Sequence, residues 1–453
     1  MSYTPLEQSI RAQLKLLDNH KPDGKNISAL DFYGHAHEFS QREIRPLDDI
    51  AYNEDRFPHE LWETLGADGM KGVIIPQEHG GMGLGNLELC LATNEVARAS
   101  GAIAISYVCD QALCSRQIAK HGTPEQQERY LPDLASGKHV GALAMSEPNS
   151  GSDVMSMTTR AKRVDGGFTI NGSKYWITNG ARFDPVTGNN LTADTLVLYA
   201  KTDDTDRVTA FIIDSENEGF KAGGIIKKAT TRGSDTAEIV FDDCFVPDNA
   251  VLGEVGKGAH IMMDGLNAER LVFAANTIGV AQAAFEETNA ESMRERFDMP
   301  IAYNQSVAFD LADAYSQIEM AQNYILLSAL QSDIDPKALT NGAAASVFLQ
   351  AGNIADIVTN RCQQLNGGTG QTVECRADRQ RGVASLLQVG AGSKQMRLRR
   401  IAEHIIPGYD QHLKLEDAFR ASVVQAAGQP YSSLDKGHAA RQIKQGGLQD
   451  LAL

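Results

Sequence analysis

A change in residue pattern part-way along the chain, from helix-like to strand-like and back, constrains its fold more than any other feature. Between about residues 146 and 257, short β-branched and aromatic runs such as GFTING, TLVLYAKT, VTAFIID and AEIVFDDCFVP are separated by Gly, Asn and Asp, which is typical of strands. Residues 28–145 are instead rich in Ala, Leu, Gln and Glu, as helices are. From 258 to 412 helical spacing returns, with one apolar stripe formed by Leu311, Tyr315, Ile318, Ala321, Ile325 and Ala329. The sequence therefore predicts an α+β chain in which a β domain separates two helical domains, with an extension at 1–27 and a tail at 413–453.

Length and charge exclude some classes of protein. The 453 residues exceed what one hydrophobic core usually organises, so we expect several packed subdomains. A net charge of −16 argues against a nucleic-acid partner, which requires a basic surface. The chain has no apolar run of the roughly 18 to 20 residues that span a bilayer, and its first 30 residues lack the apolar segment of a leader peptide. These features predict no membrane span and a cytoplasmic location.

Several familiar motifs are absent from the chain. The loop GGMGLG at 80–85 lacks the glycine spacing of a dinucleotide fingerprint, and Gly256-Lys257 is followed by glycine instead of Ser or Thr. There is no HExxH and no Cys/His cluster, so we expect no metal. Without a CxxC pair, we expect reduced, buried thiols at Cys90, Cys109, Cys114, Cys244, Cys362 and Cys375.

Two segments near the start of the β region carry most of the chemistry. The first is LAMSEPNSGSDVMSM at 143–157, where small hydroxyl residues, Pro and Gly surround two acids. Such a loop presents backbone N–H groups and hydroxyls to a polar ligand. The second is KYWITNGARFD at 174–184, where an aromatic and a Thr precede an Asn-Gly turn. Each segment by itself is also compatible with an ordinary turn or hairpin.

In this order and spacing, the two segments resemble the flavin-binding β domain of the acyl-CoA dehydrogenase family, and in particular its isovaleryl-type members. The resemblance extends from about residue 30 to about 412. It includes TRGSDTAEIVFDDCFVP, GLNAERLVFA, the RERF segment at 294–297, QLNGGTG and QVGAGS.

The resemblance implies both an architecture and a reaction. It implies a β-barrel-like central domain, a C-terminal four-helix bundle, bound FAD and a homotetramer. The implied reaction is the α,β-dehydrogenation of a short branched-chain acyl-CoA to the trans-2-enoyl-CoA, with isovaleryl-CoA as the first candidate and electron-transfer flavoprotein as the electron acceptor. Such chemistry needs a base at the alpha carbon, donors at the thioester oxygen and a hydride acceptor at the beta carbon.

The catalytic base is the most informative assignment. Many family members carry a glutamate where this chain has Ala391, in the run Gly390-Ala391-Gly392. Isovaleryl-type members place it instead on the helix that carries LxxER, and Glu269 matches that position. An acid followed by Arg in a helix is ordinarily a solvated surface residue. The family match, together with the missing acid at 391, favours Glu269 as the base, in a partly apolar setting that would raise its pKa.

Other site residues follow from the resemblance. Ser146 and Thr178 would hydrogen-bond the flavin ring, and Trp176 would lie against it, although a core-filling role for Trp176 is the alternative. The remaining flavin-side residues are Leu143, Met145, Gly151, Ser152 and Ile177. The substrate would contact Ser152, Arg270, Ala391 and Gly392, with the Ala391 N–H donating, alongside an FAD ribityl hydroxyl, to the thioester oxygen.

The adenosine end of FAD would be bound across two subunits, which is why the resemblance implies an oligomer. The matching residues are Arg294, Phe297, Gln305, Gln364, Gly367, Gly368, Ser393 and Gln395. Arg294 by itself is also compatible with an ordinary charged helix residue. The chain departs from the family pattern in this region at Asp298, Gln371, Gly382-Val383-Ala384 and Ser393-Lys394-Gln395, and an insertion at about 183–194 lengthens a hairpin.

Three hypotheses therefore remain from the sequence. The first is the branched-chain dehydrogenase. The second is a dehydrogenase for another short or medium acyl-CoA, or an oxidase that would consume oxygen during turnover. The third is a non-catalytic relative that keeps the fold and would purify without a yellow flavin.

Overall fold

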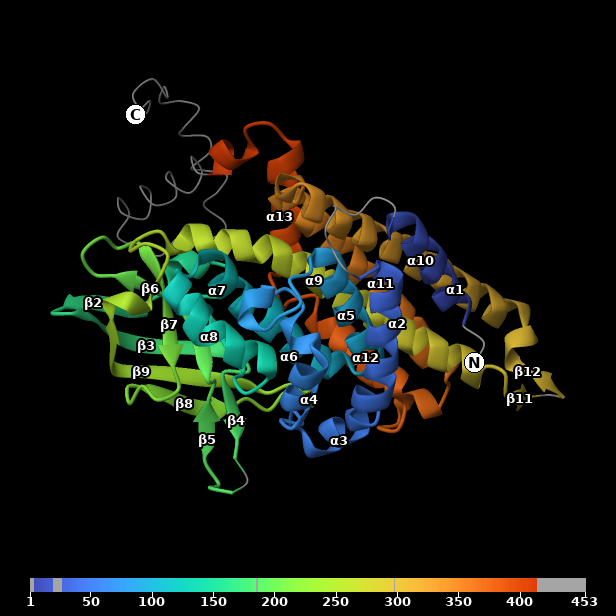
Figure 1. Cartoon of the computed structure of the whole chain (residues 1–453). Helices are drawn as coiled ribbons and strands as arrows, with labels where there is room; N and C mark the ends of the chain where they lie inside the picture. The colour runs from blue at the N-terminus through green and yellow to red at the C-terminus, as the bar shows by residue number, and fades with distance from the viewer. Residues whose placement is uncertain (1–3, 19–26, 185, 297, 414–453) are drawn as a thin grey trace, which may run out of the picture. The chain divides into compact units, whose positions relative to one another are not determined.

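The computed structural model describes residues 4–18, 27–184, 186–296 and 298–413. Its contacts divide the chain into two compact units, Met1–Leu398 and Arg399–Leu453. In the described part of the second unit, Arg399 and Arg400 both pair with Glu403 within one helix. The first unit contains the three regions predicted from the sequence (Figure 1).

The N-terminal region of the first unit is helical. Its α-helices are α1 (Pro5–Asp18), α2 (Ala29–Phe39), α3 (Leu47–Glu54), α4 (Leu61–Asp68), α5 (Asn86–Ala99), α6 (Gly101–Val108), α7 (Arg116–His121) and α8 (Pro124–Ser136). Shorter turns are η1 (Ser40–Ile44) and η4 (Cys109–Ser115), which are π-helical, and η2 (Met70–Gly72) and η3 (Gln77–His79), which are 3₁₀. Local signals set the ends of α8: Thr123 and Gln126 form a capping box, Pro124 opens the helix, and Gly137 ends it at a φ of 82°.

The middle region is a sheet whose strands run in the order β10-β7-β6-β2-β3-β9-β8. A first strand, β1, pairs in parallel with the first half of β6. The bounds are β1 (Gly141–Ala144), β2 (Arg160–Val164), β3 (Gly167–Thr178), β6 (Thr195–Thr202), β7 (Val208–Asp214), β8 (Phe220–Ile225), β9 (Thr236–Pro247) and β10 (Val251–Leu252), with a separate hairpin of β4 (Ala181–Phe183) and β5 (Asn190–Thr192), and with 3₁₀ turns η5 (Val154–Ser156) and η6 (Asp248–Ala250).

The two faces of this sheet are both apolar, but they pack against different partners. Leu196, Leu198 and Phe211 point into a core that most strands of the sheet contribute to, as in a barrel. The alternate residues Val197 and Tyr199 pack instead with residues of α7, α8 and the following helix. Strand alternation therefore gives the domain an inner core and an outer face that is attached to helices.

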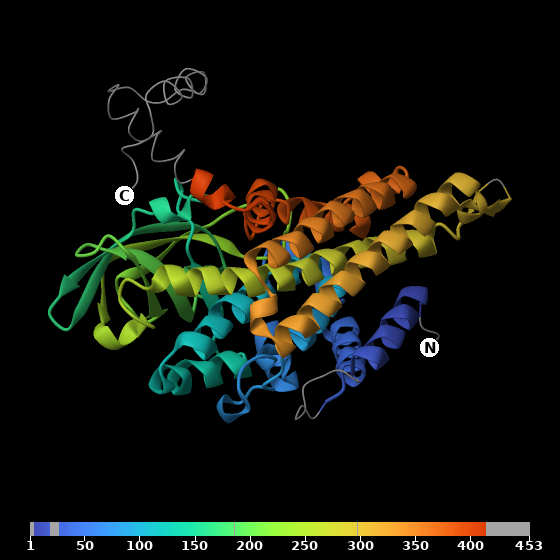
Figure 2. The same ribbon diagram turned by 90° about the horizontal axis from the view of Figure 1, so that it is seen from above.

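The C-terminal region contains the long helices of the predicted bundle. Its helices are α9 (Gly258–Glu291), α10 (Gln305–Ile334), α11 (Asn341–Leu365), α12 (Arg376–Leu386) and α13 (Lys394–Ile405), with η7 (Ile301–Tyr303), η8 (Pro336–Ala338), η9 (Thr369–Gln371) and a small hairpin of β11 (Glu295–Arg296) and β12 (Met299–Pro300). Figure 2 shows α9, α10 and α11 running side by side, and α12 contacts both α9 and α11. The apolar stripe predicted on α10 is buried at Leu311, Ile318 and Ile325.

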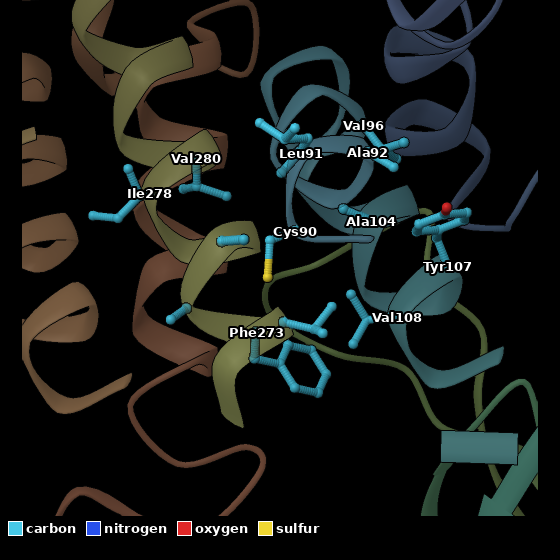
Figure 3. Packing of buried hydrophobic residues seen from close by; sticks show 14 of the residues in the cluster. Cys90, Leu91, Ala92, Val96, Ala104, Tyr107, Val108, Phe273, Ile278 and Val280 are labelled. Carbon is cyan, nitrogen blue, oxygen red and sulfur yellow. The ribbon is translucent and has the colours of Figure 1, made fainter. Parts of the chain in front are cut away.

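One continuous core joins the N-terminal and C-terminal helices. Figure 3 shows Cys90 and Leu91 of α5 facing Phe273 and Val280 of α9, all members of one buried cluster. Most of α9 beyond its first two turns is buried. The helix that carries the predicted base is therefore fixed in the interior of the unit.

The observed element bounds differ from the predicted boundaries at two places. The first strand begins at Gly141, before the predicted start of the β domain at 146, because the run GALA is too short to show a strand pattern. The extension at 1–27 includes α1, which buries Leu6, Ile10 and Leu14 in the shared core. Beyond residue 413, the predicted tail lies outside the described residues.

All six cysteines are buried. Of the helices in the described part of the chain, none combines the length and hydropathy that a bilayer crossing requires.

Helical glycines provide a test of the α5–α9 packing. A Cβ on Gly279 of α9 would lie 2.4 Å from the Asn94 carbonyl oxygen and 2.8 Å from the Ala97 Cβ, both on α5. We expect Gly279→Ala to lower the free energy of unfolding by about 1 to 3 kcal/mol, because the helices must separate. Gly34→Ala is the matched control: its Cβ meets only an atom 3.9 Å away, so helix propensity should raise stability by up to about 1 kcal/mol. Urea unfolding measures the free energy of unfolding of both variants. An equal change in the two would contradict the close contact between α5 and α9.

Candidate active site

A buried ion pair anchors the loop that carries Ser146. The ammonium group of Lys174, on β3, donates to the Glu147 carboxylate at 2.9 Å and to the Met145 carbonyl at 3.0 Å. The Tyr175 N–H donates to the Ser146 carbonyl at 2.9 Å. The loop after β1 is therefore tied to β3 on both sides of Ser146.

Both oxygens of the carboxylate in this pair accept hydrogen bonds from protein groups. Glu147 accepts from the N–H and hydroxyl groups of both Thr158 and Thr159, at 2.6 to 2.9 Å. Burial by itself would raise the pKa of Glu147, but these hydrogen bonds and the charge of Lys174 lower it to about 2. Burial lowers the pKa of Lys174 to about 8, with Glu147 opposing that shift. Glu147 is a loop anchor that the sequence did not reveal.

Trp176 lies on the surface because the strand bulges at this point. The pairing of β3 with β9 shifts register between Lys174 and Ile177, and Trp176 has a φ of 65°. A bulge re-aims a side chain. The Trp176 side chain is 58% exposed, whereas Ile177 is 3% exposed. The alternative that Trp176 fills a core is therefore wrong, since the bulge turns it outward.

The end of β3 faces the π-helix η4. The half-buried Thr178 hydroxyl lies near the Cys109 thiol, and burial raises the pKa of that thiol to about 12. The side chain of Asn179 donates to the carbonyls of Ser106 at 2.9 Å and Gly141 at 3.2 Å. π-helical turns are common at functional sites. Cys109 begins such a turn, so we regard it as part of the candidate site.

Glu269 lies in the buried part of α9. It is 5% exposed, and its Oε2 has no hydrogen-bond partner among the described residues. Burial raises the pKa of Glu269 to about 7, although the charges of Arg270 and Arg397 act in the opposite direction. Cys109 and Tyr199 are also close enough for Glu269 to raise their pKa values. Glu269 thus lies near the end of β3 and has a carboxylate oxygen that no internal hydrogen bond uses.

Arg270 is also buried, at 5% exposed, and points to a neighbouring helix. Its Nη1 donates to the side-chain oxygen of Asn341 at 2.7 Å and to that of Asn267 at 3.4 Å. The first contact links α9 to the start of α11.

A small, mainly apolar hollow opens one turn before Glu269 on α9. Leu143 and Met145, both expected on the cofactor side, are among its lining residues, and so is Leu266. The full lining is Leu113, Gln117, Leu143, Met145, Tyr199, Met262 and Leu266. Its walls therefore come from η4, α7, the end of β1, β6 and α9.

The turn that carries Ala391 has an unusual backbone. Ala391 has a φ of 53° and Gly392 a φ of 90°, both in the left-handed region that a residue with a Cβ avoids. Ala391 is half-buried and packs against the core shared by the helices. Among the described residues, its N–H donates to no protein acceptor.

The residues expected at the adenosine end of FAD are distant from Glu269 along α9. Arg294 follows the end of this helix, which at 1.5 Å per residue lies about 33 Å beyond Glu269. One chain therefore does not bring Arg294 to its own Glu269. Exposed side chains or backbone occur at Gly151, Ser152, Arg294, Gln305, Gln364, Gly367, Gly368, Gly392 and Gln395, while Ser393 is half-buried. Phe297 lies outside the described residues.

Comparison with known proteins identifies the family. Sequence models of the acyl-CoA dehydrogenase N-terminal, middle and C-terminal domains match residues 29–138, 142–244 and 256–406. The chain belongs to the acyl-CoA dehydrogenase family. Its fold is that of the family, and its class is oxidoreductase.

Named relatives of this acyl-CoA dehydrogenase include plant enzymes. It is 41% identical over 368 residues to the mitochondrial 2-methylacyl-CoA dehydrogenase of Solanum tuberosum, covering 79% of this chain and 86% of that protein. It is also 41% identical over 367 residues to the mitochondrial isovaleryl-CoA dehydrogenase of Oryza sativa subsp. japonica, covering 80% and 87%. Glutaryl-CoA dehydrogenase of Mycobacterium smegmatis, solved with FADH2, aligns with a TM-score of 0.78 and 25% identity over 87% of this chain and 98% of that chain.

The chemistry of the site fits the FAD that this family uses. Trp176 offers an exposed aromatic face, and Ser146 and Thr178 provide half-buried hydroxyls near the ends of β1 and β3. A flavin ring needs an apolar face and hydrogen-bond donors of this kind. In the described part of the chain, no three His, Cys, Asp or Glu side chains are grouped as metal ligands.

Sequence reasoning missed several residues around Glu269. Tyr199 and Gln117 line the hollow, Cys109 lies near Thr178, and Arg397 acts electrostatically on Glu269. The alternation of residues along a strand predicts only that Tyr199 is buried. No neighbouring residue in the sequence distinguishes Arg397 from the exposed residues of α13. Their roles depend on long-range contacts.

The anchoring of Glu147 generates a pH-dependent prediction. Its folded pKa of about 2 lies below the ordinary 4.5, so the stability it contributes is present above about pH 4.5 and is lost as the pH falls toward 2. We expect wild type to exceed Glu147→Gln in free energy of unfolding at pH 6, with the difference shrinking between pH 4.5 and 2.5. Urea unfolding at each pH measures it, with the exposed Glu216→Gln as control. A difference independent of pH would contradict the ionised anchor.

Proposed function

We propose that this acyl-CoA dehydrogenase catalyses the FAD-dependent α,β-dehydrogenation of a short branched-chain acyl-CoA to the trans-2-enoyl-CoA, with isovaleryl-CoA as its substrate. The observation that carries the proposal is Glu269, a buried carboxylate with an unused oxygen and a pKa near 7. A buried carboxylate oxygen without a hydrogen-bond partner is costly unless it has a function. The named isovaleryl-CoA dehydrogenase relative supports the choice of substrate.

In the proposed reaction, Glu269 removes the proton from the alpha carbon of the thioester. A general base works best when its pKa lies near the operating pH, and burial brings Glu269 into that range. Bound FAD supplies the acceptor for the hydride from the beta carbon. The burial of Glu269, which is 5% exposed, keeps water away while the proton moves.

Negative charge develops on the thioester oxygen as the proton leaves, and Ala391 stabilises it. The Ala391 N–H uses no protein acceptor among the described residues, so it is available to the substrate. Backbone donors of this kind are pre-organised and cost little reorganisation when charge develops. Arg270, held by Asn341, contributes to holding the substrate. Ser152 contacts the CoA portion, and Gly392 lies beside the thioester.

The apolar lining of the hollow beside Leu266 supports an apolar acyl group. Leu113, Leu143 and Met262 supply apolar walls, and a Cβ on Gly265 would overlap the Gln117 side chain, so this part of the pocket has little spare room. A second candidate substrate is a 2-methyl-branched acyl-CoA, which the name of the potato relative favours.

Assembly and electron transfer complete the proposal. The helix distance between Glu269 and Arg294 supports an FAD site shared between two copies of the chain, as in a homotetramer. An exposed apolar stripe on α10, formed by Met320, Tyr324, Leu327 and Ile334, supports contact with another copy. We propose electron-transfer flavoprotein as the acceptor, leucine catabolism as the setting and the cytoplasm as the location.

Replacing Glu269 tests the base. We expect Glu269→Gln to retain FAD and the thermal unfolding temperature of wild type, while anaerobic bleaching of the flavin by isovaleryl-CoA slows by several orders of magnitude, because the neutral amide accepts no proton. Stopped-flow absorbance measures the rate. The exposed Glu254→Gln should bleach like wild type. Unchanged bleaching in Glu269→Gln would remove Glu269 from the role of base.

Three further measurements distinguish the alternative functions. Bleaching by a panel of acyl-CoAs ranks the substrates, and oxygen consumption during turnover identifies an oxidase. A protein that takes up no FAD would indicate a non-catalytic relative.

The pKa of Glu269 predicts the pH dependence. The base acts only when ionised, so kcat/KM for the acyl-CoA should rise with pH through a limb centred near 7 and level off above it. Steady-state rates with an artificial acceptor between pH 5.5 and 9 measure this limb. A limb near 4.5 would mean that Glu269 is not desolvated in the free enzyme.

A further inference from the structure

Arg397 is buried beside the turn that carries Ala391. It lies on α13 and is 1% exposed. Its Nη2 donates to the carbonyl of Leu387 at 2.5 Å and to the carbonyl of Gly390 at 2.9 Å. Its guanidinium lies 3.5 Å from the centre of the Phe348 ring, on α11. One side chain thus connects α11 to the end of α12 and to the residue just before Ala391.

The contact with Gly390 bears directly on Ala391, because the Gly390 carbonyl and the Ala391 N–H belong to the same peptide group. In a trans peptide these two groups point in opposite directions. A hydrogen bond that holds the carbonyl therefore fixes the direction of the N–H. The same bond polarises the peptide and makes its N–H a stronger donor.

The backbone of Ala391 needs such support. A non-glycine residue at a φ of 53° is strained and persists only where its surroundings hold it. A second contact comes from Gln388, whose side-chain amide donates to the Gly352 carbonyl at 2.6 Å. A Cβ on Gly352 would lie 3.4 Å from Arg397 Nη1 and 3.1 Å from Gln388 Nε2, so this glycine leaves room for both side chains.

Arg397 also acts on the proposed base. Burial, together with the charge of Arg270, lowers the pKa of Arg397 to about 10, so it stays charged at neutral pH. Its charge lowers the pKa of Glu269. Among the described residues, other groups that interact electrostatically with Glu269 include Arg270, which acts in the same direction, and Cys109 and Tyr199, which are neutral at this pH. Arg397 Nε and Nη1 have no hydrogen-bond partner among the described residues, so its charge is not neutralised there by an internal ion pair.

We propose that Arg397 is a positioning residue for the dehydrogenation: it holds the Gly390–Ala391 peptide so that the N–H is preset and polarised toward the thioester oxygen. The inference rests on the proposed function. It differs from a purely structural role, because it requires effects on the chemical step that exceed effects on folding or on substrate binding.

The test uses FAD-loaded enzyme and three variants: Arg397→Gln, Arg397→Lys and, as the matched control on the same helix, the exposed Arg399→Gln. We expect Arg397→Gln to slow the limiting rate of anaerobic bleaching by isovaleryl-CoA about a hundredfold, as loss of one oriented donor does. Its acyl-CoA dissociation constant should change less than about threefold. Arg397→Lys keeps the charge and should recover part of the rate. The acid limb of kcat/KM should move to higher pH in Arg397→Gln, and less in Arg397→Lys.

Amide hydrogen exchange provides a readout independent of turnover. We expect faster exchange in the peptide covering 387–392 of Arg397→Gln, with wild-type exchange in Arg399→Gln. Wild-type bleaching in Arg397→Gln would overturn the inference and leave the proposed function standing. Loss of FAD, or a fall in unfolding temperature that accounts for the lost rate in both Arg397 variants, would also overturn it. A wild-type enzyme that no acyl-CoA bleaches would instead overturn the proposed function, and the inference with it.

Discussion

The burial of one carboxylate, that of Glu269, is the constraint on which the proposed active site depends. Taking an ionisable group out of water favours its neutral form, and here it raises the pKa to about 7 despite two nearby arginines. The group is thereby brought to the balance between ionised and neutral forms that a base needs at physiological pH. Its unused oxygen distinguishes it from Glu147, whose hydrogen bonds lower its pKa to about 2. Two buried glutamates in one protein thus have opposite properties because of their hydrogen-bond partners.

The position of that carboxylate follows from how α9 is packed. The helix contacts α5, α10, α11 and α12, and Gly279 allows α5 to approach closely. A helix packed on so many sides has little freedom to rotate, so the direction of Glu269 is set by the whole core. The β domain supplies the other side of the candidate site, where the Lys174–Glu147 pair anchors the loop after β1. Rigid elements on both sides suit a reaction that depends on alignment.

The sequence predicted the helical, β and helical regions because helices and strands space their apolar residues differently, and that spacing can be read from neighbouring residues. The sequence also shows that position 391 lacks a carboxylate, and the resemblance to the family predicts Glu269 as the base, which stays a prediction. It left open whether Trp176 filled a core, since an aromatic residue in a strand pattern can point either way. The bulge after Lys174 decided that question, and a bulge depends on the partner strand β9.

By itself, then, the sequence determined the order of the elements and the family, and it supplied the proposal of Glu269 as the base. Only the tertiary structure decided how basic Glu269 is, that Arg397 holds the peptide of Ala391, and that Tyr199 and Gln117 line the hollow. The reason is physical. Periodicity and motifs are recorded in neighbouring residues, whereas desolvation and charge act through space between elements far apart in the chain. These contacts exist only once the elements have packed.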